Sequence, residues 1–279
     1  MALQAISFGS QEMPGGSILV HGINNTGKTT LLAAALKYYS QWGKVTMLSI
    51  TREQGHSSAA GMGLEVEDLG YQCLYEAATY DDVIEWLTMV EKGGYVATGL
   101  DSLWALYQLV QIKKTGGARP PLAGKSDQNE WPFIHNDMHN LMTRWRKAAK
   151  WNLMVCPSDT GQAALKEVES GVKSDALMVC PDLNGKMATG CITWFNLVGY
   201  LICDMVKAGV KTVPKRTLSF LPSKTYLTRQ RMPFGGLISD LIPIPEGDPV
   251  TGWKAVMDKG NAAYAEAYAK HNTHTTKEE

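Results

Sequence analysis

Hydrophobic positions along the chain alternate between short apolar runs and longer amphipathic stretches. The apolar runs occupy 17–22, 44–51, 95–101 and 151–158, and helical patterns begin at Thr29 and cover 81–94 and 135–150. Runs of the first kind are typical of buried strands and stretches of the second kind of helices. The alternation predicts an α/β fold: a mostly parallel sheet flanked by helices, with the ligand at the carboxyl ends of the strands.

The pattern changes after residue 190. Three apolar runs follow closely, with turn residues between them, at 197–206, 216–223 and 224–231. Their spacing predicts additional antiparallel strands that complete the sheet.

Domain boundaries are expected near residue 245. Residues 1–245 form the expected main domain, which contains the α/β pattern. Residues 246–279 form a C-terminal segment with an alanine-rich helix from about Trp253 to Lys270 and a polar, fraying tail. Two stretches are expected to be mobile loops: 112–131 contains four basic residues with glycines and prolines, and 160–176 contains charges of both signs.

Composition narrows the possible partners and compartment. Lys and Arg together equal Asp and Glu at 27 each, so any binding to nucleic acid depends on a local basic patch. The five cysteines form no C-x-x-C pair and lie mostly in apolar runs, as reduced core thiols do. With no visible signal peptide and no run long enough to span a membrane, a cytoplasmic protein is expected.

One motif carries most of the chemical information. Gly22-x-x-x-x-Gly27-Lys28-Thr29 follows an apolar strand and opens a helix, which is the phosphate-binding loop pattern. Glycines let backbone N–H groups converge on phosphate oxygens, and the helix N-terminus adds partial positive charge. ATP and Mg²⁺ are therefore the expected cofactors; the residues expected to hold the nucleotide are Gly22, Asn24, Asn25, Thr26, Gly27, Lys28, Thr29 and Thr30. A chance match in a glycine-containing loop is the alternative.

The metal and the attacking water need acidic partners. Asp101 ends the apolar run 95–101 and is predicted to hold Mg²⁺ together with the Thr29 hydroxyl; capping of the next helix is the alternative. Because Ser102, not a glutamate, follows Asp101, the water-orienting base must lie elsewhere. Glu53, just past the run 44–51, is the candidate, with a solvated loop carboxylate as the alternative.

The phosphate loop, the Glu after the second strand and the Asp-Ser strand end together resemble a RecA-type ATPase core. Residues 181–204, which open on "PDLNGK", and 216–236, which contain "TRQR", are similar to a phage RecA-like/AAA P-loop ATPase family that includes the RecA-like branch of the Sak single-strand-annealing proteins. The resemblance covers about residues 15 to 240, and the phosphate loop is its one highly specific motif.

The resemblance implies several roles. Glu53 becomes the catalytic carboxylate, and Arg229 and Arg231 become a basic pair that reaches the γ-phosphate of a neighbouring subunit in a ring or filament. "TRQR" departs from the family's usual lysine at the first position, which favours Arg231; two exposed arginines on an edge strand are the alternative. A polar sensor after the strand 151–158 stays unassigned among Ser158, Asp159 and Gln162, where relatives commonly show His or Gln.

Single-stranded DNA is the partner that the resemblance implies. The candidate contacts to backbone phosphates are the basic loop residues Lys113, Lys114, Arg119 and Lys125, together with Arg144, Arg146 and Lys147 on the next helix. Trp145 or Trp151 could stack on a base. An exposed helix face and a solvated loop explain the same residues. His135 and His139 lack a third ligand at a suitable spacing, so they are expected to be surface or packing residues.

These observations together predict a RecA-fold ATPase that assembles on single-stranded DNA and supports annealing or strand exchange in recombination. The alternatives are a P-loop NTPase that acts as a protein-partnered assembly factor or switch, a small-molecule kinase, and a helicase or packaging-type motor. Each function has its own mark: ATP hydrolysis stimulated by DNA indicates the recombination ATPase, and hydrolysis independent of DNA indicates the protein-partnered switch. Phosphate transfer to a metabolite would indicate a kinase, and directional unwinding or translocation a motor.

Overall fold

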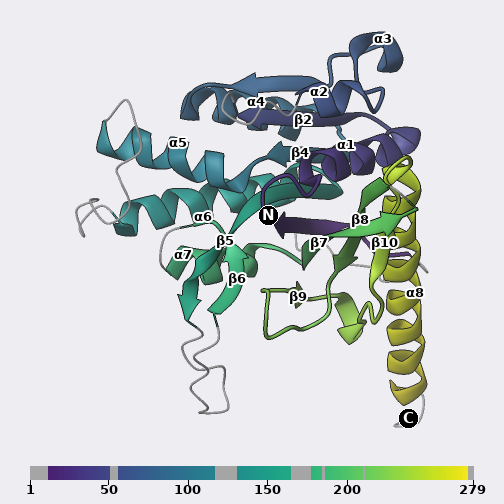
Figure 1. Cartoon of the computed structure of the whole chain (residues 1–279). Coiled ribbons are helices and arrows are strands. Elements are labelled where there is room, and N and C mark those ends of the chain that lie inside the picture. The colour runs from purple at the N-terminus through teal and green to yellow at the C-terminus, as the bar shows by residue number, and fades with distance from the viewer. Residues whose placement is uncertain are drawn as a thin grey trace.

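The computed structural model describes residues 12–50, 56–116, 131–164, 177–183, 186–209 and 211–275. Within these ranges the chain forms a central sheet with helices on both faces (Figure 1). The strand order is β10-β8-β7-β1-β5-β4-β2-β3, with β6 paired to β5 and β9 paired to β7. This architecture confirms the predicted α/β class.

The sheet is parallel over most of its width. The parallel strands are β1 (Gly16–Gly22), β2 (Val45–Ile50), β3 (Leu74–Ala77), β4 (Ala97–Asp101), the first half of β5 (Trp151–Ala164) and β7 (Leu197–Ala208). The antiparallel strands are β6 (Leu177–Pro181), β8 (Lys211–Ser219), β9 (Arg229–Gln230) and β10 (Ile242–Ile244). Antiparallel pairing after residue 190 is therefore confirmed between β7 and its partners β8 and β9, although β7 itself runs parallel to β1 and only Arg229–Gln230 of the expected run 224–231 forms a strand. Strand β5 lies between β1 and β4, so the ends of β1 and β4 open on one cleft.

Helices cover the two faces of the sheet, and each face has its own hydrophobic core. One face carries α1 (Lys28–Tyr39), α2 (His56–Ala60) and α8 (Pro249–Thr275); the other carries α4 (Tyr80–Gly93), α5 (Leu103–Thr115), α6 (Trp131–Ala148) and α7 (Lys186–Gly190). The shorter helices are α3 (Val66–Leu69), η1 (Ser40–Trp42), η2 (Cys191–Trp194) and η3 (Pro233–Gly235). Consecutive residues of one strand enter different cores: Leu153 belongs to the core on the α1 face and Met154 to the core on the α6 face.

Strand β4 contains two residues that are unusual in a buried strand, and the packing explains both. A Cβ at Gly99 would lie 2.8 Å from Cδ1 of Leu36, so only glycine lets α1 approach this closely. Thr98 is buried, and its hydroxyl donates to Oδ1 of Asn152 at 2.9 Å. Asn152 in turn donates to the carbonyls of Arg146 and Ala149. These bonds satisfy the buried polar groups, as a core requires.

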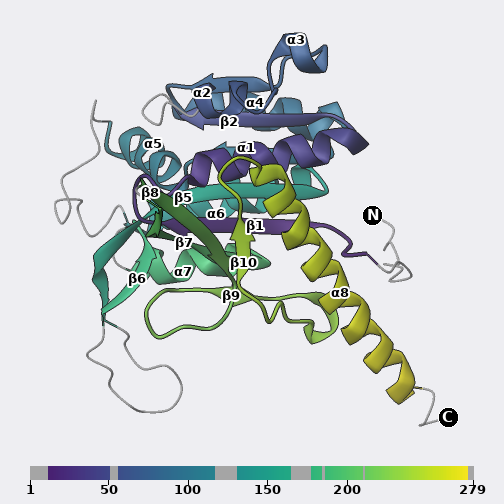
Figure 2. The same ribbon diagram turned by 45° about the vertical axis from the view of Figure 1, so that its right-hand side comes forward.

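Helix α8 packs against α1 (Figure 2), and a cluster of aromatic side chains lies at this contact. The ring of Tyr39 stacks on Trp151 at 5.4 Å and meets Trp253 edge-on at 6.5 Å. The Tyr39 hydroxyl lies 2.9 Å from Sδ of Met257. The cluster links α1, β5 and α8. The predicted domain division near residue 245 stays a prediction.

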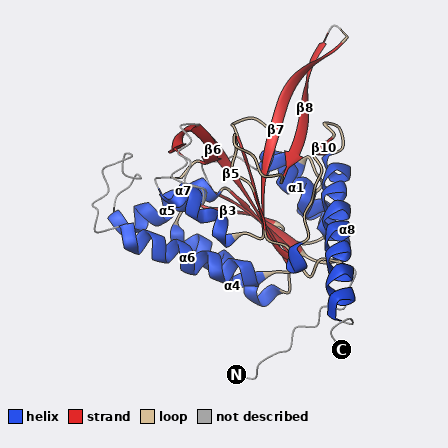
Figure 3. Ribbon diagram, turned by 90° about the horizontal axis from the view of Figure 1, so that it is seen from below, coloured by secondary structure: helices blue, strands red, loops and turns tan. Residues whose placement is uncertain are grey.

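Two hairpins extend past the carboxyl edge of the parallel strands. Strand β7 and strand β8 project together beyond the sheet (Figure 3). The second half of β5 turns away from β1 and β4 and pairs with β6. Both hairpins therefore begin beside the end of β1.

Several expected boundaries are corrected by the structure. Residues 112–115 continue α5 and residues 160–164 belong to β5, so these parts of the two expected loops are helix and strand. Residues 117–130 and 165–176 lie outside the described residues. Helix α8 begins at Pro249 and continues to Thr275, past the expected end at Lys270. Of the cysteines, Cys73, Cys156, Cys180 and Cys191 are buried and Cys203 is half-buried, all as free thiols. Within the described part of the chain, no helix combines the length and apolarity that crossing a membrane requires.

Candidate nucleotide-binding site

The loop between β1 and α1 has the backbone of a phosphate cradle. Gly27 has φ +91° and Asn25 has φ +63°, so the chain curls in the left-handed region before the helix begins. A Cβ at Gly22 would lie 2.9 Å from the carbonyl oxygen of Leu201, so the first glycine of the motif allows a close approach to β7. The motif glycines are thus required by geometry.

The N-terminus of α1 is open to an anion. Gly27 supplies no side-chain cap, and no acidic residue occupies the first turn. By contrast, the N-terminus of α4 is closed by a capping box between Thr79 and Asp82. Uncapped amides together with the helix dipole favour a phosphate at α1.

Lys28 points its ammonium group into the loop. Its Nζ donates to the carbonyl oxygens of Gly22 at 2.9 Å and Ile23 at 2.7 Å. The bonds hold the positive charge where phosphate oxygens would be bound. A charged acceptor such as phosphate makes stronger hydrogen bonds than a neutral carbonyl does, so it competes with these partners.

Thr29 and Asp101 meet across the cleft. The Thr29 hydroxyl donates to Oδ2 of Asp101 at 2.8 Å, and Asp101 is buried. The first turn of α5 is capped by Ser102, whose hydroxyl accepts from the amide of Ala105. Because Ser102 performs the capping, the alternative interpretation of Asp101 as the helix cap is not needed.

A cleft of about 380 Å³ lies over the loop. Its lining contains six of the eight predicted cofactor residues and the predicted metal ligand, together with residues that the sequence did not single out. The lining residues are Asn24, Asn25, Gly27, Lys28, Thr29, Thr30, Ser58, Asp101, Ser102, Val155, Pro157 and Arg216. Gly22 and Thr26 belong to the backbone of the same loop.

Ser158, one of the three sensor candidates, pairs with a histidine of β1. Its hydroxyl lies 2.8 Å from Nδ1 of His21, and Nε2 of His21 lies 2.5 Å from the carbonyl oxygen of Leu227. Since a carbonyl only accepts, Nε2 carries the proton and Nδ1 accepts from Ser158. The pKa of His21 is lowered to about 4, mainly by its complete burial and also by nearby Lys28, although the hydrogen bond to the Leu227 carbonyl opposes the shift. A neutral histidine therefore holds the Ser158 hydroxyl beside β1, the strand that leads into the phosphate loop. The side chains of Asp159 and Gln162 are outside the described residues.

The predicted arginine pair lies away from this chain's own cleft. Arg229 pairs with Val198 of β7, and the amide of Arg231 donates to the carbonyl of Asn196 at 2.7 Å. Because Leu197 is in register with Ile18, the pair lies beside the first half of β1, whereas the loop follows its last residue. That Arg229 and Arg231 reach the γ-phosphate bound by a neighbouring subunit stays a prediction. Glu53 lies outside the described residues, so its role also stays a prediction.

The predicted DNA-contact residues are engaged in local contacts. Nζ of Lys113 lies 3.5 Å from Asp81 and 3.8 Å from the centroid of the Tyr80 ring. Nζ of Lys114 lies 2.9 Å from Asp137. Arg119 and Lys125 lie outside the described residues. A phosphate that bound Lys113 or Lys114 would have to displace a carboxylate.

The other residues expected to contact DNA, on helix α6 and at the start of β5, include an ion-paired arginine and two buried tryptophans. Arg144 makes a two-pronged ion pair with Glu91, at 3.0 and 2.8 Å, and this bond lowers the pKa of Glu91. Trp145 is fully buried, and Trp151 is buried against Tyr39. Stacking of a base on either tryptophan is therefore excluded in this structure. Among the described residues, no cluster of three His, Cys, Asp or Glu side chains is placed to hold a metal.

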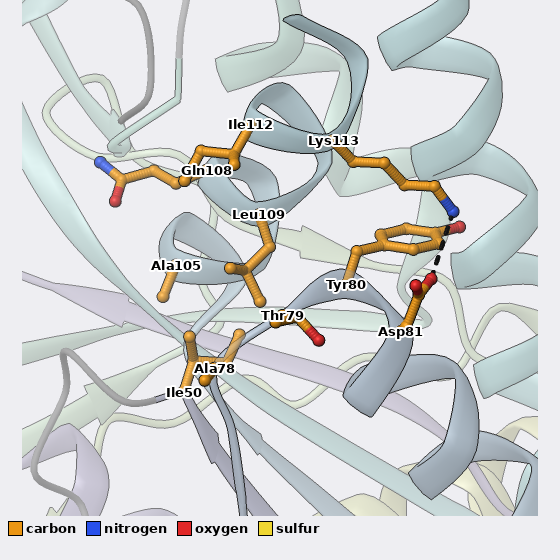
Figure 4. Close-up of a pocket in the computed structure, with 10 residues that line it drawn as sticks. All are labelled: Ile50, Ala78, Thr79, Tyr80, Asp81, Ala105, Gln108, Leu109, Ile112 and Lys113. Carbon is orange, nitrogen blue, oxygen red and sulfur yellow. Dashed lines mark ion pairs between the residues drawn. The ribbon is translucent and has the colours of Figure 1, made fainter. Parts of the chain in front are cut away.

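A second cavity, of about 330 Å³, lies at the carboxyl ends of β2 and β3 (Figure 4). Its wall is mainly apolar, with Ile50, Ala105 and Leu109 on one side. Tyr80, Asp81 and Lys113 form its polar end, where the Lys113–Asp81 ion pair closes one side. The cavity is separate from the loop cleft, and the two share no lining residue among those described.

The donor set fits a nucleotide with its divalent cation. The open helix N-terminus and Lys28 match phosphate oxygens, while the Thr29 hydroxyl and the Asp101 carboxylate are the oxygen donors that Mg²⁺ prefers. When bound, Mg²⁺ supplies charge neutralisation between phosphate groups.

The first strand of the mostly parallel sheet, β1, leads through a glycine-rich loop into an uncapped helix, and β4, separated from β1 by β5, carries the Asp101 carboxylate. This combination defines a P-loop NTPase domain. The family model described as an AAA domain matches residues 15–232, most of the chain. The chain therefore belongs to this AAA domain family. A search of curated proteins finds no match to it.

Proposed function

We propose that the chain is an ATPase that binds ATP with Mg²⁺ and assembles on single-stranded DNA to support annealing or strand exchange in recombination. The observation that carries the nucleotide part is the geometry of Lys28, Thr29 and Asp101 around one cleft. The DNA and recombination parts rest on the sequence resemblance.

Each residue has a defined task in this proposal. The loop amides and Lys28 bind and orient the β- and γ-phosphates, and Thr29 with Asp101 fixes the position of the cation. Glu53 accepts a proton from the attacking water. Burial of Asp101 and Ser102 beside the cleft keeps the electrostatic contacts strong, since a low local dielectric increases each of them.

Assembly into an oligomer completes the site. Arg231 from a neighbouring protomer supplies positive charge to the γ-phosphate, so hydrolysis depends on the subunit contact. The location of Arg231 beside the first half of β1, at an exposed position, leaves its guanidinium group accessible to a neighbour.

The test is ATP hydrolysis by the purified protein with and without single-stranded DNA, beside Lys28→Ala. We expect DNA to stimulate hydrolysis and Lys28→Ala to abolish it, since the lysine binds the transferred phosphate. Hydrolysis that needs Lys28 but ignores DNA would reject the recombination role and favour a protein-partnered nucleotide switch.

DNA contact has its own test. Lys113→Ala and Lys114→Ala should each reduce the salt dependence of DNA affinity by about one unit of slope, if each neutralises one phosphate. Asp137→Asn, which frees Lys114 from its carboxylate partner, should raise the affinity. Wild-type affinity and slope in all three variants would place the DNA on another surface.

A further inference from the structure

The strand β8 carries an arginine to the phosphate loop of its own chain. Arg216 lies two residues before Leu218, whose side chain packs in the core on the α1 face, so Arg216 shares that face. The β7–β8 hairpin projects beyond the sheet (Figure 3). Arg216 pairs with Cys203 of β7, which lies past the last residue of β7 that pairs with β1, so the Arg216 side chain reaches the loop that follows β1. Arg216 lines the same cleft as Lys28 and Thr29.

The contacts of Arg216 fix the guanidinium over the loop. Nε donates to the carbonyl oxygen of Thr26 at 2.8 Å. A Cβ at Gly27 would lie 2.9 Å from the same nitrogen, so the guanidinium packs directly on the glycine backbone. Its side chain is only 21% exposed.

The second partner of Arg216 is weak. One terminal nitrogen lies 4.0 Å from Oε1 of Glu246, and the Glu246 side chain is 56% exposed. An ion pair of this length at the surface contributes little to stability. A guanidinium has five N–H donors in a planar fork that matches phosphate oxygens. A phosphate in the cleft would therefore compete effectively with Glu246.

From this geometry we propose that Arg216 binds a phosphate of the nucleotide in the cleft of its own chain, exchanging Glu246 for that phosphate and thereby linking the β7–β8 hairpin to nucleotide occupancy. The proposal rests on the proposed nucleotide site. It is independent of the arginine pair expected to act between subunits, because Arg216 and the loop belong to one chain.

The experiment measures the affinity of fluorescent ATP and ADP analogues for the wild type, Arg216→Lys, Arg216→Gln and Glu246→Gln. Lys215→Ala is the matched control, since Lys215 is exposed on the neighbouring position of β8. We expect a loss of about 10-fold or more for Arg216→Gln and a smaller loss for Arg216→Lys, as for a hydrogen bond to a charged group. A loss for ATP alone would identify the γ-phosphate, and equal losses for ATP and ADP the β-phosphate.

Glu246→Gln should increase the affinity for nucleotide, whereas the Arg216 variants should decrease it. Removal of the competing carboxylate should tighten binding by about 2-fold or more, which a merely structural Arg216 would not produce. In the wild type, nucleotide should slow hydrogen exchange in 203–216, and Arg216→Lys should reduce this protection. Melting temperatures without nucleotide identify any variant that fails to fold.

The outcomes separate this proposal from the proposed function. If the wild type binds no nucleotide, the proposed function fails. If the wild type binds but Arg216→Gln and Arg216→Lys bind as tightly as Lys215→Ala, the role of Arg216 is overturned. Unchanged affinity in Glu246→Gln would overturn the exchange between the two partners.

Discussion

The hydroxyl of Thr29 donates a 2.8 Å hydrogen bond to Oδ2 of Asp101, across 72 positions of sequence. The bond joins the first turn of α1 to the end of β4 with strand β5 between β1 and β4. Both oxygens therefore face one point of the cleft.

Thr29→Val and Asp101→Asn should each weaken Mg²⁺-dependent ATP binding by about 10-fold, and the double variant should lose little more than the worse single one. The reason is that both groups act on one cation, so their effects are coupled. Affinity measured with and without a chelator checks this. Without divalent ions the variants should resemble the wild type; an equal loss under both conditions would contradict a metal role.

Mixing two inactive proteins tests the shared site. Lys28→Ala lacks a functional loop, and Arg231→Ala lacks the arginine that the proposal places at the neighbouring site. In mixed assemblies, a Lys28→Ala protomer can supply Arg231 to the intact loop of an Arg231→Ala protomer, so ATP hydrolysis should reappear. Arg229→Ala serves as the comparison. Full activity of Arg231→Ala alone would contradict the role in trans.

His21 predicts a specific dependence of stability on pH. Its pKa is lowered to about 4 in the folded protein from 6.5, so the unfolded chain binds the proton more strongly. Its contribution is complete above pH 6.5 and is lost as pH falls towards 4, by about 3 kcal/mol in total.

Denaturant unfolding of His21→Phe beside the wild type at several pH values isolates this contribution. The variant should be less stable near pH 7, by about 2 kcal/mol, because Ser158 and the Leu227 carbonyl lose their partner. The difference between the two proteins should shrink as pH falls below 6.5 and change sign before pH 4 is reached, because the wild type loses about 3 kcal/mol over this range. A difference that stays constant would show that His21 does not titrate in this range.

Gly99→Val should destabilise the protein by about 1 to 3 kcal/mol, because the added carbons would meet Leu36 and Leu32 of α1. Gly190→Ala is the control: Gly190 has helical φ −72° and nothing within 4 Å of the position of a Cβ. Thermal unfolding should show Gly190→Ala unchanged or slightly more stable. Equal melting temperatures for Gly99→Val and the wild type would contradict the close packing.

Local spacing explains what the sequence could predict. The residues of the phosphate loop are neighbours in the chain, and the strand before them and the helix after them follow from periodicity alone. Asp101 could be predicted for a similar reason, because the end of an apolar run marks the carboxyl end of a strand and therefore the edge of the sheet where ligands bind. The class of fold and most of the nucleotide site follow from these two signals.

Residues brought together by distant pairing could not be predicted in the same way. Arg216 meets Thr26 across 190 positions, and this contact depends on the register of β7 with β8. His21 meets Leu227 across 206 positions, although a histidine inside an apolar strand was a visible signal. Lys113 and Lys114 were assigned to a loop because glycines and prolines follow them, but the helix ends only at Gly116, which has φ +64°.

Strand β5 belongs to two ladders of opposite direction, parallel with β1 and β4 and then antiparallel with β6. A partner that pulled on the β5–β6 hairpin would load β5 lengthwise. The hydrogen bonds to β1 and β4 would then share the force in shear and break together instead of one by one. The hairpin is thus continuous with the strand that separates the phosphate loop from Asp101, and tension applied to it would act directly on that strand.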